Sequence, residues 1–321
     1  MSCGPGPSRR WWPAARGTRS RGGVVGERRL LWPSLAGPGL LWLLLFFLTP
    51  FFAILSVAMG RLDPILHLAV PVWNPIQWNP DIFGTVFTEL FEGRLGEIFL
   101  RTIVFVLVAS AVCLVVGYPV AYYVSRRAGR WKILLLLLIL APFWINYIMR
   151  MFAWQSLLET DGYMNDLLTA VGLLQEPRNW LAGHPETVIL GLVYGYIPYF
   201  ILPLFAALDR IDNNVLEAAR DLGASPFWTF VKVTLPLSKQ GVLAGLVIIM
   251  LPMFGDYYTP EFMGFSRAPI RMIGNEISTR LQAGISEPEG SALTILLMVF
   301  VALLMLYYLV SVFRAQREAT S

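Results

Sequence analysis

Asp256, Tyr257 and Tyr258 are the residues whose types and spacing most directly suggest chemistry. They follow Gly255 near the end of a long apolar run. A carboxylate beside aromatic faces suits a cationic ligand, because an ammonium group pairs with the carboxylate and is attracted to the ring faces. The simpler interpretation is an acid near a membrane surface within a belt of aromatic side chains, which is a common arrangement. The pattern alone favours the simpler interpretation, and the three residues remain candidates for a ligand pathway.

Residue patterns typical of catalytic and metal sites are scarce elsewhere. His67 and His184 lie far apart in the sequence, so they offer no metal-ligand spacing and no Ser/His/Asp or Cys/His arrangement. Cys3 and Cys113 cannot form a disulfide framework, and Cys113 lies inside an apolar run, where it is expected to be a small core residue. We therefore expect no metal site and no enzymatic activity.

Nucleotide binding is also not expected in this chain. No G-x-x-x-x-G-K-[ST] sequence occurs, and neither Lys232 nor Lys239 follows the glycine-rich loop that cradles phosphates. The chain should therefore need no cofactor, and any energy from ATP must arrive through another subunit.

Composition identifies the elements that position these residues. The 321 residues are 56% hydrophobic and 14% charged, whereas soluble domains carry about 25% charged residues. A helix that crosses a bilayer needs about 20 mostly apolar residues. Six runs meet this requirement: 38–59, 98–124, 133–150, 187–208, 240–259 and 290–313. The sequence predicts an all-α polytopic membrane protein with six transmembrane helices and no nucleic-acid partner; the third run is the shortest, and a break within it is an open alternative.

The distribution of Lys and Arg predicts the orientation. On one side, cations precede the first run, fill the loops 125–132 and 210–239, and follow the last run (Arg9, Arg10, Arg16, Arg19, Arg21, Arg28, Arg29, Arg126, Arg127, Arg130, Lys132, Arg210, Arg220, Lys232, Lys239, Arg314, Arg317). The opposite side has fewer cations and most of the acids, among them Asp63, Asp81, Asp161, Asp166 and Glu261. The positive-inside rule therefore places both termini in the cytoplasm.

The chain divides into three predicted parts. Residues 1–37 are rich in Arg, Gly and Pro and are expected to form a disordered cytoplasmic extension. A secretory signal is the alternative, but the apolar stretch is long and no cleavage site is obvious near Gly60, so an uncleaved first helix is preferred. Residues 38–313 form the transmembrane domain, and residues 314–321 form a cytoplasmic tail.

The segment from Glu217 to Pro236 predicts two short cytoplasmic helices joined by a turn. Asn213 or Asn214 can cap a helix that begins near Val215. Gly223 and the Ser225-Pro226 step interrupt this helix and start a second one. Leu235-Pro236 is expected to end the second helix before the fifth span. Periodicity alone allows an ordinary amphipathic loop on the membrane surface as readily as a segment that docks in a partner.

The spacing within this segment resembles a known signature. Glu217-Ala218-Ala219, then Gly223 and finally Val233-x-Leu235-Pro236 look like the coupling (EAA) motif of permease subunits of binding-protein-dependent, type I ATP-binding-cassette importers, with Val233 where Ile is commoner. The resemblance implies that Glu217, Ala218, Ala219, Gly223, Leu235 and Pro236 contact a cytoplasmic ATPase.

Further motifs resemble the spermidine/putrescine branch of these permeases. They are Ala141-Pro142-Phe143-Trp144, Arg150, Trp154, Gly162-Tyr163-x-Asn165, Gly191-Leu192-Val193-Tyr194, Pro198-x5-Leu204, Leu251-Pro252, Gly255-Asp256, Pro260 and Ile273-Gly274-Asn275. The likeness covers residues 38–313, although sulfate, iron and thiamine permeases share parts of it. It implies the type I permease fold in a bacterial inner membrane, a second, distinct permease, an ATPase dimer and an extracytoplasmic substrate-binding protein.

Several functional alternatives stay open at this point. The importer could carry another small solute, such as an anion, a metal complex or a vitamin. An ion-coupled carrier is disfavoured, because the intramembrane charges are few and lie near the ends of spans: Arg101, Arg150 and Asp256. Arg150 is expected to pair with an outer acid such as Glu159 or to reach the surface. A scaffolding or enzymatic membrane subunit without a transport path is the remaining class.

Overall fold

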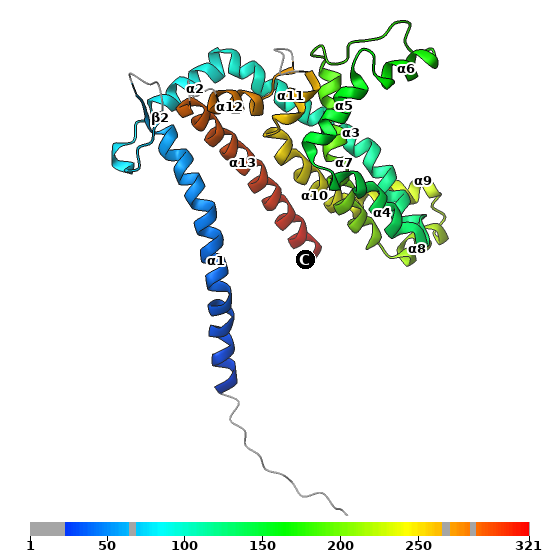
Figure 1. Ribbon diagram of the computed structural model, residues 1–321. Helices are drawn as coiled ribbons and strands as arrows, with labels where there is room; N and C mark the ends of the chain where they lie inside the picture. The colour runs from blue at the N-terminus through cyan, green and yellow to red at the C-terminus, as the bar shows by residue number, and fades with distance from the viewer. Residues whose placement is uncertain (1–22, 64–68, 265–269, 283–286, 321) are drawn as a thin grey trace, which may run out of the picture. The chain divides into compact units, whose positions relative to one another are not determined.

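The computed structural model describes residues 23–63, 69–264, 270–282 and 287–320. The chain divides into two compact units, Met1–Phe52 and Ala53–Ser321. Helix α1, Gly23–Ala58, runs through the first unit into the second. The remaining helices are α2 Asp81–Glu92, α3 Arg94–Arg126, α4 Lys132–Leu140, α5 Tyr147–Leu158, α6 Tyr163–Ala170, α7 Pro185–Asp209, α8 Asn213–Asp221, α9 Pro226–Thr229, α10 Leu235–Phe254, α11 Tyr258–Gly264, α12 Ile273–Gln282 and α13 Glu287–Thr320 (Figure 1). One antiparallel ribbon pairs β1, Arg61–Leu62, with β2, Ala69–Val70.

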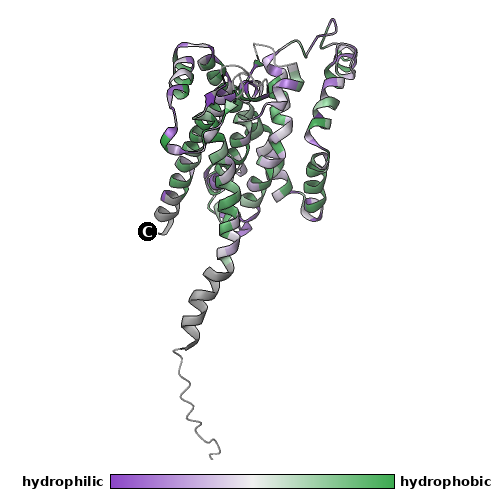
Figure 2. Cartoon of the chain, turned by 60° about the vertical axis from the view of Figure 1, so that its left-hand side comes forward, coloured by the Kyte–Doolittle hydropathy of each residue, from purple (hydrophilic) through white to green (hydrophobic). Residues whose placement is uncertain are grey.

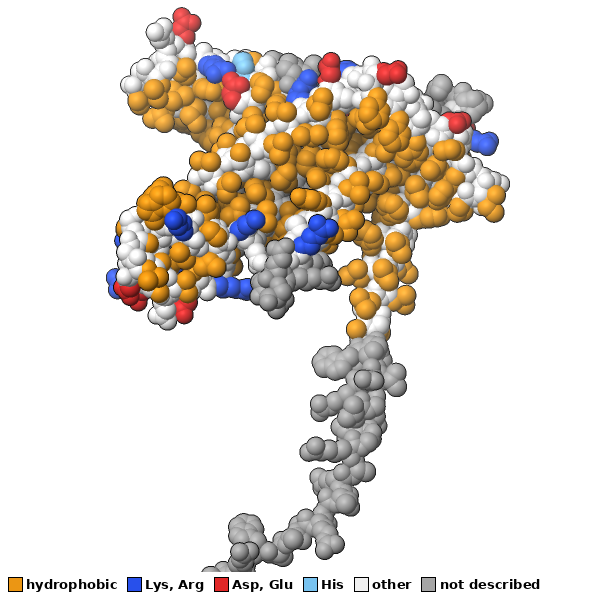
Figure 3. Space-filling view, turned by 180° about the vertical axis from the view of Figure 1, so that it is seen from behind, with side chains coloured by type: hydrophobic (Ala, Val, Ile, Leu, Met, Phe, Trp, Pro, Cys, Tyr) orange, Lys and Arg blue, Asp and Glu red, His pale blue; other side chains and the backbone are white. Residues whose placement is uncertain are grey.

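The all-helical membrane class is confirmed. Within the described residues, five helices are long and apolar enough to cross a membrane: Ala36–Ala58, Arg94–Arg126, Pro185–Asp209, Pro226–Phe254 and Glu287–Val312. In Figure 2 the hydrophobic residues run along the long helices, and hydrophilic residues gather in the connections. The surface seen in Figure 3 carries a broad hydrophobic zone with charged side chains beyond it, as expected for a lipid-facing surface.

The predicted third span, 133–150, is not one straight helix. Its two parts, Gly129–Trp144 and Tyr147–Leu158, are bent by 87° at a short break, and they make a sixth span only if counted together. After α4 the backbone forms a 3-10 turn, η3 (Ala141–Trp144), that contains Pro142. Asn146 then starts α5, because its Oδ1 accepts a hydrogen bond from Ile148 N at 2.9 Å. A proline followed by a new N-cap explains the break.

Two other boundaries differ from the predicted ones. The backbone is already helical from Gly23, within the predicted extension 1–37, of which residues 1–22 lie outside the described part. The predicted fifth span, 240–259, ends at Phe254, because Gly255 terminates α10 and a separate helix α11 starts at Tyr258. The helix α10 starts and ends five residues earlier than the predicted span, and its earlier end places Asp256 in a junction between two helices.

Helices α3, α7 and α10 form the centre of the second unit. Phe200 of α7 is fully buried among them. A Cβ added at Gly117 of α3 or at Gly245 of α10 would lie 2.8 Å from its ring. These glycines therefore allow close approach of the helices, which is how membrane helices pack without a hydrophobic driving force. Cys113 is buried in the same core, as predicted.

Candidate functional site

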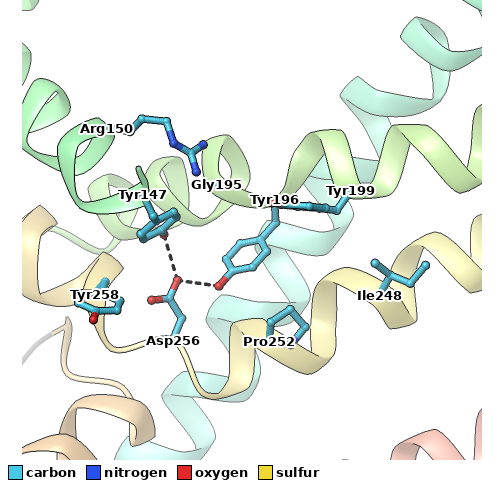
Figure 4. Close-up of a pocket in the computed structure, with 9 residues that line it drawn as sticks. All are labelled: Tyr147, Arg150, Gly195, Tyr196, Tyr199, Ile248, Pro252, Asp256 and Tyr258. Atoms are coloured by element: carbon cyan, nitrogen blue, oxygen red, sulfur yellow. Dashed lines mark hydrogen bonds between the residues drawn. The ribbon is translucent and has the colours of Figure 1, made fainter. Parts of the chain in front are cut away.

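A cavity of about 410 Å³ lies where α5, α7 and the end of α10 meet. Its lining is aromatic with two opposite charges: Tyr147, Arg150, Gly195, Tyr196, Tyr199, Ile248, Pro252, Asp256 and Tyr258 (Figure 4). The break in the third span places the start of α5 beside α7. A Cβ at Gly195 would lie 3.1 Å from the ring of Tyr147, so this glycine allows the ring to rest against α7.

Asp256 is buried and fully hydrogen-bonded. Its Oδ2 accepts hydrogen bonds from Tyr147 Oη at 3.2 Å, Tyr196 Oη at 3.1 Å and Thr259 Oγ1 at 2.5 Å. Its Oδ1 accepts a hydrogen bond from Thr259 N at 3.1 Å, in the first turn of α11. Asp256 is 6% exposed, so its carboxylate is enclosed by protein groups rather than facing solvent. Hydroxyl donors offset the cost of burying this carboxylate.

The two tyrosines after Asp256 differ in the cavities that they line. Tyr258 lines the cavity, whereas Tyr257 lines a neighbouring cavity of about 560 Å³ that also includes Tyr258, Glu261, Asn275 and Gln282. Their rings remain in contact, with centroids 4.0 Å apart. Asn275 Nδ2 donates to Tyr257 O at 2.8 Å and so fixes the backbone between the two tyrosines.

Arg150 differs most from its sequence-based interpretation. It is 7% exposed and forms no salt bridge with Glu159 or any other acid in the described part of the chain. Its guanidinium carbon lies 4.1 Å from the ring centroid of Phe143, 5.2 Å from that of Tyr147 and 5.8 Å from that of Tyr194. Figure 4 shows the side chain extending beside Tyr147 and Gly195. The prediction that it pairs with an outer acid or reaches the surface is wrong.

Sequence reasoning missed the donors around Asp256. Tyr147 and Tyr196 lie in different helices, 109 and 60 residues away in sequence. Thr259 alone had a local signal, because a carboxylate three residues before a threonine at a helix start is a typical cap.

The predicted coupling segment folds as two short helices with a turn between them. The cap of α8 is Asp212, whose Oδ1 accepts from Asn214 N at 3.0 Å, rather than Asn213 or Asn214. Gly223 ends α8 with a φ of +86°, a conformation that favours glycine. Ser225 caps α9, with its Oγ accepting from Trp228 N at 3.4 Å, and Pro226 follows as predicted.

Leu235-Pro236 does not end the second helix. A π-helical turn, η4 (Phe230–Thr234), joins α9 to α10, and α10 begins with Leu235. Proline is tolerated in the first turn of a helix, since it lacks only an N–H that need not be bonded there. The coupling segment is therefore continuous with α10, which ends at Phe254, two residues before Asp256.

Two contacts attach the coupling segment to α3. Arg126, at the end of α3, donates to Ile211 O at 2.9 Å and Asn213 Oδ1 at 3.0 Å in the loop 210–239, and also to Leu208 O at 2.7 Å in α7. The ring of Phe230 packs edge-on against Tyr118 and Tyr122, with centroids 5.6 Å apart in both cases. Between these attachments the segment exposes large apolar side chains: Leu222, Phe227 and Trp228.

A network of ion pairs fixes the opposite end of the helices. Arg280 of α12 pairs with Glu89 of α2 at 2.8 Å, with Glu289 of α13 at 2.6 Å and with Glu276 of its own helix at 3.2 Å. Glu276 is buried and also pairs with Arg271 at 3.1 Å. Burial alone would lower the pKa of Arg280, but hydrogen bonds to Glu89 and Glu276 raise it above its ordinary value.

The described residues contain no group of three or more His, Cys, Asp or Glu that could hold a metal ion. His184 lies 4.0 Å from Glu186, and His67 and Cys3 lie outside the described residues. The site therefore presents aromatic faces, hydroxyl groups and two buried charges. Such a set can bind and orient an ion.

Comparison with known families gives one match that covers most of the chain. Residues 33–317 match the family described as "Binding-protein-dependent transport system inner membrane component". The match includes the cavity, the coupling segment and all the candidate spans.

Characterised relatives agree with this match. The chain is 34% identical to the spermidine/putrescine transport system permease protein PotB of Haemophilus influenzae over 267 residues, which cover 83% of this chain and 89% of that protein. It is 35% identical to PotB of Escherichia coli K12, over 69% of this chain and 80% of that protein. It is 30% identical to the inner membrane ABC transporter permease protein YdcU of the same organism, over 70% of this chain and 74% of that protein.

A solved structure has the same fold. A chain of a bacterial alginate ABC transporter, solved in complex with an alginate-bound periplasmic protein, superposes with a TM-score of 0.63. The alignment covers 90% of this chain and 96% of that chain at 18% identity.

Proposed function

This chain belongs to the family of binding-protein-dependent transport system inner membrane components, and on that premise we propose that it forms the translocation pathway of an ATP-driven importer of polyamines. It is a multi-pass inner-membrane permease subunit, and such subunits are not enzymes. The observation that carries the polyamine assignment is the identity of about a third to spermidine/putrescine permeases over most of their length.

The cavity supports a cationic substrate. Asp256 supplies a buried negative charge, and Tyr147, Tyr196 and Tyr258 surround it with aromatic faces. An ammonium group gains from both features, since its attraction to a carboxylate and to ring faces strengthens where water is excluded. In the proposed pathway Asp256 and Tyr258 contact the substrate and Tyr257 lines its continuation.

The coupling role is assigned to the segment 210–239. Glu217, Ala218, Ala219 and Gly223 would contact a partner ATPase through α8, and Leu235 and Pro236 would join that contact to α10. The exposed side chains of Leu222, Phe227 and Trp228 suit burial in a groove of a soluble subunit. Because η4 and α10 form one continuous helix, a push on α8 and α9 would reach the junction at Asp256.

The complete importer would contain more subunits. Membership of the family implies a separate ATPase and an extracytoplasmic binding protein. We propose an ATPase dimer and a second, distinct permease that completes the pathway. The topology follows from the same proposal: six spans with the bent pair counted as one, both termini and the loop 210–239 in the cytoplasm, and Asp256 near the outer end of its span.

The experiment is uptake of labelled spermidine and putrescine by proteoliposomes that contain this chain, its ATPase and second permease, with the binding protein added outside. Polyamine uptake that requires ATP and is lost in Glu217→Ala supports both the substrate and the coupling role. Binding-protein-stimulated ATP hydrolysis without polyamine uptake would retain the importer and reject the polyamine. Uptake that survives ATP depletion and stops when the proton gradient collapses would reject ATP coupling.

A further inference from the structure

Arg150 is a buried cation without a polar partner. Its Nε and Nη1 atoms are inaccessible to solvent and have no hydrogen-bond partner in the described part of the protein. Buried guanidinium groups are normally paired, because an unpaired charge is costly to remove from water. The stabilisation that is present comes from three rings, those of Phe143, Tyr147 and Tyr194. We define these three rings as the aromatic box.

The only acid that lines the same cavity does not compensate Arg150. Asp256 and Arg150 both line it, yet they form no ion pair. The Asp256 carboxylate is held by Tyr147, Tyr196 and Thr259. The cavity therefore holds two separated charges of opposite sign, and Tyr147 contacts both: its ring faces Arg150 and its hydroxyl donates to Asp256.

Aromatic faces attract a guanidinium and an ammonium group for the same reason. We propose that Arg150 is a tethered cation that occupies the ammonium site of the substrate and thereby selects cations with at least two ammonium groups. This inference rests on the proposed function and adds the basis of selectivity. Arg150 is thus a specificity-determining residue, and it fills the aromatic box when no substrate is present.

The selectivity follows from comparing what an entering ligand gains and loses. A monoamine that displaces Arg150 exchanges one cation in the aromatic box for another, so the net gain is small. A diamine or polyamine makes the same exchange and also places a second ammonium at Asp256, which gains a charge pair in a site that excludes water. A ligand can bind only when the resident group has left the site. Its apparent affinity is therefore its intrinsic affinity multiplied by the fraction of molecules in which the site is vacant.

The test compares two ligands of similar length, 1,4-diaminobutane and n-butylammonium. Each is added to the purified, assembled transporter, and affinity is derived from the shift in thermal midpoint, since a ligand that binds the folded state raises it. We expect the unmodified protein to respond to the diamine and only weakly to the monoamine. In Arg150→Gln, the affinity for n-butylammonium should rise by about tenfold, because the ligand no longer has to displace a cation from the rings. A tenfold change corresponds to the strength of one to two cation–π contacts.

Two variants serve as controls. Arg150→Lys keeps a tethered cation and should keep the preference for the diamine. Arg178→Gln removes an arginine that also lies over an aromatic ring, at 4.8 Å from Trp180, but outside the cavity; it should leave the preference unchanged. If Arg150→Gln lacks a cooperative unfolding transition, Arg150→Met retains the apolar stem of the side chain and replaces it in the comparison.

The outcomes separate this inference from the proposed function. Polyamine uptake with no gain of monoamine binding in Arg150→Gln overturns the inference and leaves the function intact. A gain of monoamine binding without polyamine uptake retains the tethered cation and overturns the assigned substrate. If acetate raises the thermal midpoint of the unmodified protein and this rise disappears in Arg150→Gln, Arg150 binds an anion and the inference is overturned.

Discussion

Gly223 offers a direct test of the coupling role. Its φ of +86° closes α8, and its N–H donates to Arg220 O at 2.8 Å. A Cβ at this position would meet no atom within 4 Å, so Gly223→Ala adds no clash and changes only the backbone preference. Holding a non-glycine residue in the left-handed region costs about 1–2 kcal/mol. If docking to the ATPase requires this turn, the docked state becomes less populated by a factor of about 5 to 30.

The assay measures two rates in the same proteoliposomes, polyamine uptake and ATP hydrolysis. For Gly223→Ala we expect uptake to fall by the factor above, and the number of molecules imported per ATP to fall with it. Gly223→Asn should lose less, because asparagine tolerates the left-handed region better. The amount of variant in the membrane should stay normal, since the turn carries no packed side chain.

Gly172 provides the matched control. Its φ is +80°, and a Cβ there would also meet nothing within 4 Å, yet it lies after α6, outside the coupling segment. Gly172→Ala therefore carries the same backbone penalty and should leave the uptake per ATP unchanged. Normal uptake in Gly223→Ala, or equal losses in both variants, would refute the reasoning.

Three further predictions concern the cavity and the ion-pair network around Arg280. Asp256→Asn keeps the shape of the cavity and removes its negative charge, so polyamine uptake should fall by about tenfold, as loss of about 1.4 kcal/mol implies; an equal fall in membrane expression would reduce this to a folding effect. Gly195→Ala places a Cβ 3.1 Å from the ring of Tyr147 and should lower the free energy of unfolding by about 1–3 kcal/mol, which denaturation in detergent would detect; an unchanged midpoint would mean that the ring yields freely. Glu276→Gln breaks buried ion pairs with Arg271 and Arg280 and should cost about 3 kcal/mol in the same measurement, and a loss below about 0.5 kcal/mol would show that the network adds little.

Local signals predicted the coupling segment well. A proline, a glycine and a serine that caps a helix act within a few residues of themselves, so Gly223 and Ser225-Pro226 indicated the turn between α8 and α9 correctly. The cap is Asp212, one residue before the nearer of the two predicted caps, Asn213 and Asn214, which is the usual precision of helix boundaries. The π-helical turn before Leu235 was missed, because no residue type specifies the wider turn.

The candidate site was only half predictable for a similar reason. Composition identified Asp256 as an unusual charge in an apolar region, and adjacency suggested Tyr258. The donors Tyr147 and Tyr196 come from two other helices, α5 and α7, and Tyr147 lies in the first turn of α5, directly after the break in the third span. Arg150 was predicted to pair with an outer acid or to reach the surface, but the fold surrounds it with aromatic rings. Contacts between distant segments depend on helix packing, which periodicity does not specify.

The apolar surface of α1 has a consequence for how the protein is made. Its residues from Leu40 to Leu48 are all Leu, Trp or Phe, so the helix is apolar around its whole circumference there, within the candidate span Ala36–Ala58. A segment of this kind partitions into lipid by its own hydrophobicity and needs no neighbour to remain there. It can therefore leave the translocon as an independent anchor while the ribosome is still translating α7 and α10. The bent pair of α4 and α5 differs, since its break must satisfy freed backbone groups, and it does so locally: Ile145 N donates to Pro142 O at 3.4 Å and Ile148 N to Asn146 Oδ1 at 2.9 Å.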